Sequence, residues 1–471
     1  MTPARDPQDK PLAALVAPDI LDLLEESPSA IAAEVEELHP ADLADVAELL
    51  PREQVVAFLQ ALPPARAADV LEYLDEELRT ELLEQIPTAQ AAALVSQMTP
   101  DDRIDVLGEI DEHVAEEIVS GLPAEARAET ERLLQFDPDS AGGIMTTEFV
   151  SVSADAFVDD TLEAVRALAR SGRKEATYAI YAADRDGRLA GVLSLRELLA
   201  AAPGARIADV AWTEVVSVGP NAPRQEVAQL TANYDLIAVP VVSESGHLMG
   251  VVTVDDVIDA IQEEQTEDIQ RLGGMEALDE PYTSIGFWSM IRKRGGWLTV
   301  LFVGQFLTAS AMQGFGDQLE KALVLSLFIP LIVSSGGNSG SQATSLIIRA
   351  MALGEVTLKD WWRVALRELP TGLTLGALLG ILGVARIVLW QQLGLWDYGE
   401  HYVLLAMTVG LAVLGVVAFG SLIGSMLPFA LRRFGLDPAS ASAPFVATLV
   451  DVTGLVIYFM VAVLLLSGTL L

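Results

Sequence analysis

The sequence contains no cysteine and only four histidines, so the side chains that bind softer metals are almost absent. Disulfide bonds and iron–sulfur clusters are therefore excluded, and zinc or copper sites are disfavoured. The remaining candidate metal ligands are oxygen atoms, which hard cations such as Mg²⁺ and Ca²⁺ prefer. Any metal chemistry in this chain is expected to involve hard divalent ions.

Positive charge is also scarce, because 29 Lys and Arg residues stand against 66 Asp and Glu residues, for a formal net charge of −37. Residues 1–283 hold 18 of the basic and 57 of the acidic residues, whereas residues 284–471 hold 11 and 9. The first part is strongly anionic, and the second is apolar and nearly neutral. Such an anionic part argues against nucleic acid as a partner and favours cations.

Catalytic signatures are missing as well. The sequence has no nucleotide-hydrolysis loop, no nucleophile–base set and no catalytic metal cluster, so it does not predict an enzyme. Residues 1–18 lack the charged and then apolar pattern of a signal peptide, so we expect residues 1–283 to stay in the cytoplasm.

A twelve-residue repeat runs from Leu38 to Leu122, with an apolar residue at each twelfth position and a proline or polar helix starter after it. Each repeat predicts one short helix and a turn. Because short helices bury their apolar faces by stacking, we expect an all-α superhelical domain at 1–140. An ordinary helical bundle with regular loops is the alternative.

Residues 141–262 predict two α/β units in tandem. The first has candidate strands at 149–152, 178–181 and 191–194, with helices beginning at Thr161 and Leu195; the second has strands at 215–218, 237–242 and 250–253, with helices from Arg224 and Val254. The two copies resemble a pair of CBS domains. Thr253 and Asp256 lie where such pairs commonly hold a ribose, so the resemblance implies adenosine or ATP as one ligand, while many CBS pairs are structural modules without one.

The last of these helices continues into an acidic segment that ends near Gly273 and Gly274, and we expect a connecting helix in the region 263–290. Its acidic residues recur at helical spacing along one side. They lie at positions 256, 259, 263, 264, 267 and 268. Like charges this close repel one another and weaken the helix unless a cation neutralises them.

Five apolar stretches follow, which predicts an α-helical transmembrane domain at 291–471 in contact with membrane lipid. Uncharged stretches run over 295–316, 322–348 and 402–431, while 438–471 has a single charge and another stretch begins near Leu369. A helix of about 20 residues crosses a hydrocarbon core of roughly 30 Å.

Basic residues set the expected orientation of these spans. Arg292, Lys293 and Arg294 precede the first span, and two further basic clusters fall on the same side, whereas the opposite loops carry only Lys321. Because cytoplasmic loops are enriched in Lys and Arg, we expect a multi-pass protein of the plasma (inner) membrane with its N-terminus inside and its C-terminus outside.

Asp451 is the only charge within the last span. An ionised carboxylate at the bilayer centre costs roughly 2.5–3.5 kcal/mol, so it must face water, a cation or a partner group. The structural alternative is an aspartate bonded to a neighbouring helix. One carboxylate does not complete the octahedral oxygen shell of Mg²⁺, but two copies across a dimer axis could hold an ion that keeps its water.

The second span contains the segment Ser334–Gln342, which combines three glycines with hydroxyl and amide side chains. In lipid this composition indicates either an unwound helix that lines a path or very close helix packing.

Acidic helical repeats, tandem CBS units, an acidic connecting helix and five spans, in this order, resemble the MgtE family of magnesium channels and transporters. Two motifs carry the resemblance: Gly336–Gln342, and Leu436–Ala439 running on through Pro444 to the segment 450–455. The resemblance covers essentially the whole chain. It implies a homodimer with its pore on the two-fold axis, closed by a plug formed by the connecting helix when cytosolic Mg²⁺ is plentiful.

The resemblance also implies individual roles. The pore carboxylate falls on Asp451 and a pore carbonyl on Ala447. Ala443 lies at the pore mouth, where some relatives have a polar residue, and this difference bears on ion selectivity. Regulatory Mg²⁺ sites fall on acids of the N-domain, the CBS pair and the connecting helix. These acids are Asp101, Asp105, Asp235, Asp256, Asp259, Glu264, Glu267 and Asp268.

Two alternatives stay open. The first is a CBS-regulated transporter for another divalent cation such as Co²⁺, Ca²⁺ or Mn²⁺. The second is a membrane-anchored sensor of Mg²⁺ or nucleotide that does not conduct. Asp451 distinguishes the second alternative from a transporter, because a mere anchor has no reason to bury a carboxylate in the membrane.

Overall fold

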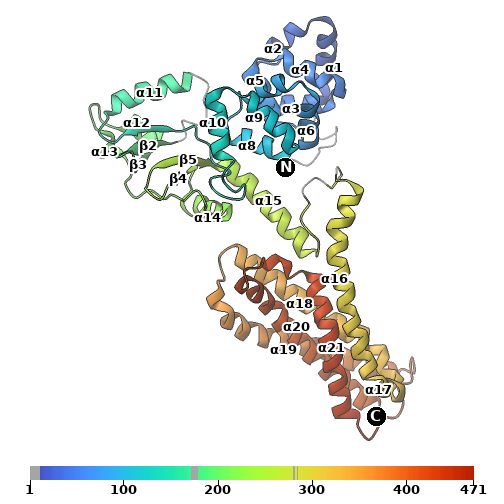
Figure 1. Ribbon diagram of the computed structural model, residues 1–471. Helices are drawn as coiled ribbons and strands as arrows, with labels where there is room; N and C mark the ends of the chain where they lie inside the picture. Colours follow the sequence, from blue (N-terminus) through green and yellow to red (C-terminus); the bar gives the residue numbers. More distant parts are fainter. Residues whose placement is uncertain (1–10, 171–178, 279–281, 284, 471) are drawn as a thin grey trace. The chain divides into compact units, whose positions relative to one another are not determined.

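The computed structural model describes residues 11–170, 179–278, 282–283 and 285–470 (Figure 1). The chain divides into two compact units, with the boundary between Glu263 and Glu264.

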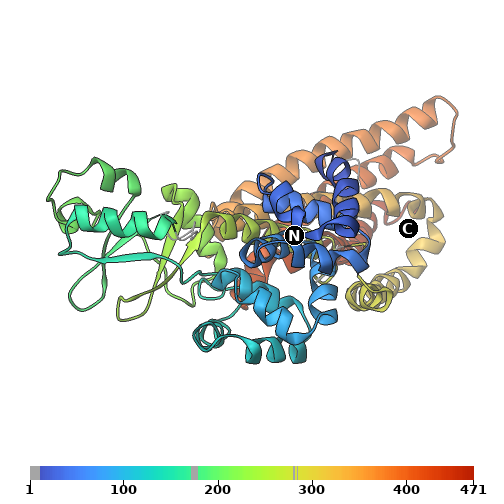
Figure 2. The ribbon, with the colours of Figure 1, turned by 90° about the horizontal axis from the view of Figure 1, so that it is seen from above.

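The first part of unit one is a stack of short helices whose starts repeat every twelve residues, as the sequence predicts (Figure 2). After α1 (Pro11–Glu26), a 3₁₀ turn and α2 (Ile31–Glu34), the regular series is α3 (Pro40–Leu49), α4 (Arg52–Ala61), α5 (Pro64–Tyr73), α6 (Glu76–Gln85), α7 (Thr88–Val95), α8 (Pro100–Glu109), α9 (Glu112–Gly121) and α10 (Ala124–Leu133).

In most repeats the apolar residue ends its helix and is buried in a common core. Leu50, Leu62, Leu74 and Leu122 are C-caps with extended backbone and are buried. Proline or aspartate then restarts the next helix; for example, the Asp75 carboxylate accepts a hydrogen bond from the Glu77 amide at 3.1 Å. Alternating helices pack together along the stack, α3 on α5 and α7 on α9, so the superhelical domain is confirmed.

The second part of unit one contains two small α/β modules. In the first, β1 (Val150–Ser153) pairs in parallel with β2 (Ile180–Ala183), which pairs antiparallel with β3 (Leu189–Leu193); α11 (Val158–Arg170) and α12 (Leu195–Ala200) accompany them. In the second, β4 (Ala238–Val242) and β5 (Leu248–Thr253) are antiparallel neighbours of α14 (Arg224–Tyr234), with α13 (Ile207–Val210) before it.

Two details of the strand predictions differ from the structure. The strand expected at 215–218 is reduced to one parallel bridge between Val218 and Val241, because Val218 is the residue of this segment whose backbone pairs with β4. The start of the strand expected at 178–181 and the end of the helix predicted from Thr161 lie in 171–178, outside the described residues. The α/β pair itself is confirmed.

The helix after β5, α15 (Val254–Leu272), ends next to Gly273 and Gly274, and Gly274 has a left-handed φ of +76°. Non-glycine residues rarely adopt this backbone conformation, so the Gly pair stops the helix at the predicted place. Unit two begins within α15, at Glu264.

Unit two contains five helices long and apolar enough to cross a membrane, counted over the described residues. They are α16 (Phe287–Gly314), α18 (Ile329–Ala352), α19 (Trp361–Gln392), α20 (Tyr402–Arg433) and α21 (Ala443–Leu466), with the short helix α17 (Gly316–Lys321) and several 3₁₀ turns between them. The third span begins before Leu369, because α19 continues regularly through Pro370.

Helix α20 is the centre of this unit and packs against α18, α19 and α21, while α16 packs against α21 (Figure 1). A Cβ atom added at Gly420 would come within 2.4 Å of the Gly336 carbonyl oxygen, and one added at Gly424 within 2.2 Å of the Gly340 carbonyl oxygen. The glycine motif of the second span therefore serves close packing of a continuous helix, and the alternative of an unwound segment is not observed.

Candidate ion path and acidic sites

The half-buried Asp451 lies in the first half of α21. Its Oδ2 accepts a hydrogen bond from the Gln305 amide nitrogen of α16 at 2.8 Å. The aspartate is thus bonded to a neighbouring helix, as the structural alternative requires. However, the amide is neutral and brings no positive charge, so this contact does not replace a cation as the partner of Asp451.

Ala447 lies one helical turn before Asp451 on α21 and faces the glycine motif of α18. A Cβ atom added at Gly337 would meet the Ala447 Cα and Cβ atoms at 3.5 Å. Near the start of α21, the Ser341 hydroxyl of α18 donates to the Ala443 carbonyl at 3.2 Å. The two motifs that the sequence singled out are therefore in direct contact.

A polar stripe, which consists of Ser334, Asn338 and Gln342, is exposed on α18 at a spacing of four residues. An open hollow of ≈ 440 Å³ adjoins its end and is lined by Ser341, Gln342, Ser345 and Leu346. Amide and hydroxyl groups do not face lipid without a partner, because unsatisfied polar groups in hydrocarbon are costly. This side of α18 is therefore suited to water or to another protein surface.

An acidic cluster in unit one joins α8 to the first part of α15, and we call it the α8–α15 cluster. It comprises Asp101, Asp102 and Asp105 on α8 and Asp255, Asp256, Asp259 and Glu263 on α15. One oxygen of Asp101, Oδ1, is buried with no hydrogen-bond partner among the described residues. Asp256 accepts a hydrogen bond from the Thr253 hydroxyl at 2.6 Å.

Burial, together with mutual repulsion, raises the pKa values of these carboxyls. Burial raises the pKa of Asp102 to about 7, and Asp101 raises it further than Asp255 does. Burial also raises the pKa of Asp101, Asp256 and Asp259, with Asp101 adding to the effect on Asp256.

The pKa of Asp105 also rises to about 7, through desolvation and then through Asp101, Asp102, Glu109 and Glu263. Solvent still reaches the Asp105 side chain. The neighbouring carboxylates add to the effect of desolvation, and a bound cation would relieve their repulsion.

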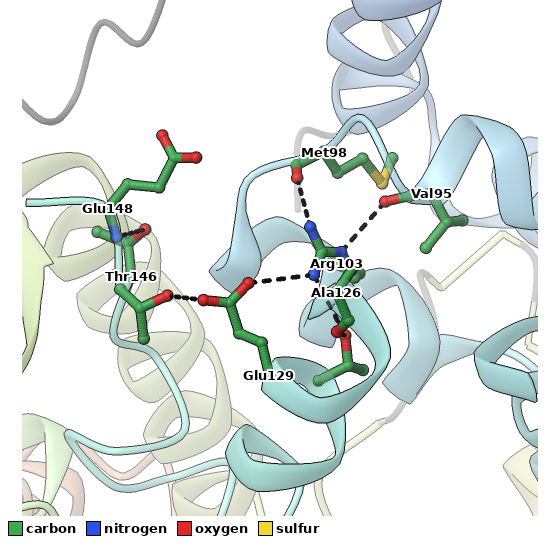
Figure 3. Close-up of polar contacts among 9 residues, drawn as sticks. Val95, Met98, Arg103, Ala126, Glu129, Thr146 and Glu148 are labelled. Carbon is green, nitrogen blue, oxygen red and sulfur yellow. Dashed lines mark hydrogen bonds and ion pairs between the residues drawn. The ribbon is translucent and has the colours of Figure 1, made fainter. Parts of the chain in front are cut away.

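Helix α8 is held in place by the buried Arg103 (Figure 3). Its guanidinium donates to the Val95 carbonyl at 3.2 Å and the Met98 carbonyl at 3.0 Å, and forms an ion pair with Glu129 of α10 at 3.6 Å. Glu129 in turn accepts from the Thr147 hydroxyl, next to Thr146, which pairs with β5. These contacts fix the acidic face of α8 against the second α/β module.

A second acidic cluster, in unit two, joins the end of α15 to the turn before α21. Burial raises the pKa of Asp268 to about 6, and Glu264, Asp437 and Glu267 raise it further. Arg271 forms ion pairs with both Glu267 and Asp437. We call these four acids and Arg271 the α15–Asp437 cluster.

Among the described residues, no group of three or more carboxylate or imidazole side chains is close enough to enclose a metal ion. Asp235, predicted as a further site, is exposed at the end of α14 with a φ of +52°, and no described contact joins it to either cluster.

The predicted nucleotide residues lie at the start of α15. Thr253 is buried and its hydroxyl donates a hydrogen bond to Asp256. A bound ribose would have to replace this hydrogen bond. In the first module, Ser194 and Glu197 form a reciprocal cap on α12, and Glu197 also accepts from the Trp212 indole. Adenosine binding stays a prediction.

Sequence reasoning missed three residues that contact predicted site residues: Gln305, Arg271 and Asp437. Gln305 is an amide within an apolar stretch, and Asp437 belongs to the recognised segment Leu436–Ala439, so both carried a visible signal. Arg271 is the only basic residue of α15, on its last turn.

Comparison with known proteins bears on all three parts of the chain. The family described as a divalent cation transporter, MgtE, matches residues 329–461; the MgtE intracellular N domain matches 38–139; and the CBS domain matches 141–204 and 207–263. The chain is 43% identical over 347 residues to the magnesium transporter MgtE of Thermus thermophilus, and the match covers 74% of each protein.

Two solved structures are similar to the first part of this chain. One is the soluble part of a magnesium transporter, with 30% identity and a TM-score of 0.51, covering 54% of this chain and 99% of that one. The other is the cytosolic domain of the Mg²⁺ channel MgtE in complex with ATP, with 37% identity and a TM-score of 0.48, covering 52% and 99%. With its helical N domain, CBS pair and five apolar helices, this chain belongs to the MgtE family of magnesium transporters.

Proposed function

We propose that this protein is a Mg²⁺-selective channel or transporter for magnesium uptake, inhibited by the cytosolic Mg²⁺ that it admits. The observation that carries the proposal is Asp451, a carboxyl group within an apolar span whose partner, Gln305, is a neutral amide and brings no compensating charge. An ion path is the simplest reason to keep such a group.

The path itself requires more ligands than one chain supplies. Mg²⁺ needs octahedral oxygen coordination, and Asp451 with the Ala447 carbonyl offers too few groups unless the ion stays hydrated and a second copy contributes. The exposed polar stripe of α18 supports a homodimer, because Ser334, Asn338 and Gln342 would then face a water-filled axis instead of lipid.

Regulation follows from repulsion within the two acidic clusters. When cytosolic Mg²⁺ is scarce, the carboxylates repel one another and α8 separates from α15. When Mg²⁺ is abundant, it neutralises them, the acidic domains compact, and the connecting helix closes the inner mouth of the path. The buried oxygen of Asp101 without a partner among the described residues supports this role, because such an atom is costly unless a cation compensates it. Such switching needs only a few kcal/mol of differential binding.

The orientation that fits this mechanism has the acidic part and the N-terminus in the cytoplasm and the C-terminus outside, in the inner membrane. Arg292, Arg294 and Arg349 lie at the ends of spans on one side, together with Arg432 and Arg433.

The transport proposal is tested by growth of a bacterium that lacks its own Mg²⁺ uptake systems. Wild-type protein should restore growth at low Mg²⁺, and Asp451→Ala should not. Asp397→Ala, which removes a carboxylate from a loop outside the spans, is the matched control and should restore growth. Equal growth with Asp451→Ala would remove the pore assignment.

Flux into liposomes separates transport from sensing. Reconstituted wild-type protein should admit Mg²⁺ faster than Ca²⁺, Co²⁺ or Mn²⁺. Liposomes that stay impermeable to all four ions would favour a membrane-anchored sensor, and a preference for another ion would identify a different cargo.

The regulatory proposal is tested by measuring the distance between α8 and α15. Because the chain has no native cysteine, spin labels can be placed on cysteines introduced at Gly108 of α8 and Ile258 of α15, both of which are exposed. In full-length protein, Mg²⁺ should shorten and sharpen the distance between the labels. Asp101→Asn should shift the distribution toward the short distance without Mg²⁺, and a distribution insensitive to Mg²⁺ would contradict the proposal.

A further inference from the structure

Gln305 is the single polar contact to the Asp451 carboxylate among the described residues, and it comes from a different span. Helix α16 presents its apolar residues outward: the side chains of Phe302, Phe306 and Leu307 are all more than half exposed. Gln305 lies instead on the half-buried side that contacts α21. A polar amide on a transmembrane helix costs free energy in the membrane, so the group that it bonds indicates its role.

The two helices are fixed against each other around this contact. A Cβ atom added at Gly304 would come within 3.0 Å of the Thr448 methyl group, so the helices approach closely at this level. Two turns toward the start of α16, the Trp297 indole donates to the Ser442 hydroxyl at 3.1 Å, and Ser442 caps α21. Trp297 thus fixes the register that brings the Gln305 amide to Asp451.

We propose that Gln305 is a positioning residue for the ion path: its amide holds one oxygen of Asp451 and leaves the other to face the passing ion. This inference rests on the proposed function and deepens it. A lysine or arginine at this position would neutralise the carboxylate, whereas an apolar residue would leave its rotamer unfixed. A neutral donor alone keeps both the charge and the direction.

Orientation determines which ions are accepted. A hydrated Mg²⁺ ion has a rigid octahedral shell, so it needs its carboxylate oxygen at a defined place, whereas the shell of Ca²⁺ adapts in number and geometry. Fixing Asp451 therefore favours Mg²⁺ over Ca²⁺. Loss of the amide should reduce this preference more than it reduces total ion flux.

The experiment compares Mg²⁺ and Ca²⁺ flux in liposomes containing full-length wild type, Gln305→Met and Gln313→Met. Methionine has the length of glutamine without its donor, and Gln313 is an exposed amide near the end of the same helix, so it is the matched control. Gln305→Met should lower the Mg²⁺-to-Ca²⁺ flux ratio by roughly tenfold, as expected for loss of a hydrogen bond to a charged group. Gln313→Met should keep the wild-type ratio.

A second variant distinguishes loss of the hydrogen bond from a folding defect. Gln305→His places an N–H donor at a similar reach and should recover most of the flux ratio, which a purely structural role would not produce. An unchanged ratio in Gln305→Met, whatever its total flux, would overturn this inference while leaving the transport proposal intact. Wild-type liposomes that admit no Mg²⁺ would instead refute the transport proposal itself.

Discussion

The guanidinium of Arg271, on the last turn of α15, donates a hydrogen bond to the carboxylate of Asp437, which caps the turn before α21. Arg271 also forms an ion pair with Glu267 one turn earlier. The guanidinium of Arg271 therefore connects the end of α15 to the turn before α21. Under the proposed regulation Glu267 binds Mg²⁺, and Arg271 would then compete with the ion for this carboxylate.

Replacing Arg271 with glutamine should sensitise the protein to cytosolic Mg²⁺. Without the competing guanidinium, Glu267 and Asp437 are available to the ion, and the concentration for half-inhibition of transport should fall about twofold to fivefold, in keeping with a partly exposed ion pair. Liposome flux at controlled Mg²⁺ on the cytoplasmic side measures this. Arg196→Gln, which removes an exposed cation from α12, is the control. A higher inhibitory concentration in Arg271→Gln would show that the ion pair holds the closed state instead.

The α8–α15 cluster should respond to pH in a defined direction. The pKa of Asp102 and Asp105 is about 7 with α8 and α15 together, against an ordinary value of 3.8. A carboxyl whose pKa is raised by compaction favours the compact state most at low pH. This contribution is lost as the pH rises from about 4 to about 7, because the separated carboxyls release their protons first.

The spin-label pair on Gly108 and Ile258 measures this effect in full-length protein. Without Mg²⁺, the short distance should be more populated at pH 6 than at pH 8, and saturating Mg²⁺ should remove the difference. Asp102→Asn combined with Asp105→Asn should also weaken the pH dependence. A larger short-distance population at pH 8 than at pH 6 would contradict the expected direction.

The glycine motif of α18 allows a paired test of helix packing. A Cβ atom at Gly340 would meet a Val446 methyl at 2.8 Å and the Gly420 carbonyl oxygen at 3.0 Å, whereas one at Gly337 has ordinary contacts of 3.5 Å. Gly340→Ala should destabilise the membrane domain by about 1–3 kcal/mol, the usual cost of overpacking. Gly337→Ala should change stability much less. Thermal unfolding in detergent compares the two, and equal losses would count against close packing as the reason for the motif.

Nucleotide binding at the second CBS module is testable through Thr253. If ATP binds there, its ribose must take over the hydrogen bond between Thr253 and Asp256. Thr253→Val should then weaken ATP binding by about tenfold, as expected for one hydrogen bond to a charged group. Calorimetric titration of the full-length protein measures this. Ser194→Ala in the first module should loosen the cap of α12 but leave ATP affinity unchanged.

Much of the fold is predictable because local signals determine it. Proline and aspartate mark each helix start in the repeat, and an apolar residue at each end fixes the twelve-residue period, so α3 to α10 could be placed from Pro40 onward. The spans follow from hydropathy, and Gly273 with Gly274 marks the end of α15. In each case the residues that determine an element lie within it or within a few positions of its ends.

The contacts between distant segments could not be predicted in this way. The pairing of Gln305 with Asp451 joins residues 146 positions apart and depends on the register of α16 on α21. The bond between Arg271 and Asp437 spans 166 positions. Likewise, Val218 forms only one β-bridge where a strand was expected. Whether a ladder forms there depends on how the segment lies against β4, which is distant in sequence.

The contact between the Gly336 and Gly420 backbones has a mechanical consequence. Where two main chains touch with no side chain between them, neither helix can slide or rotate without a clash, and the buried bond of 3.0 Å between Ser339 and Ser421 locks the same level. Helices α18 and α20 are therefore expected to travel as one rigid body during opening.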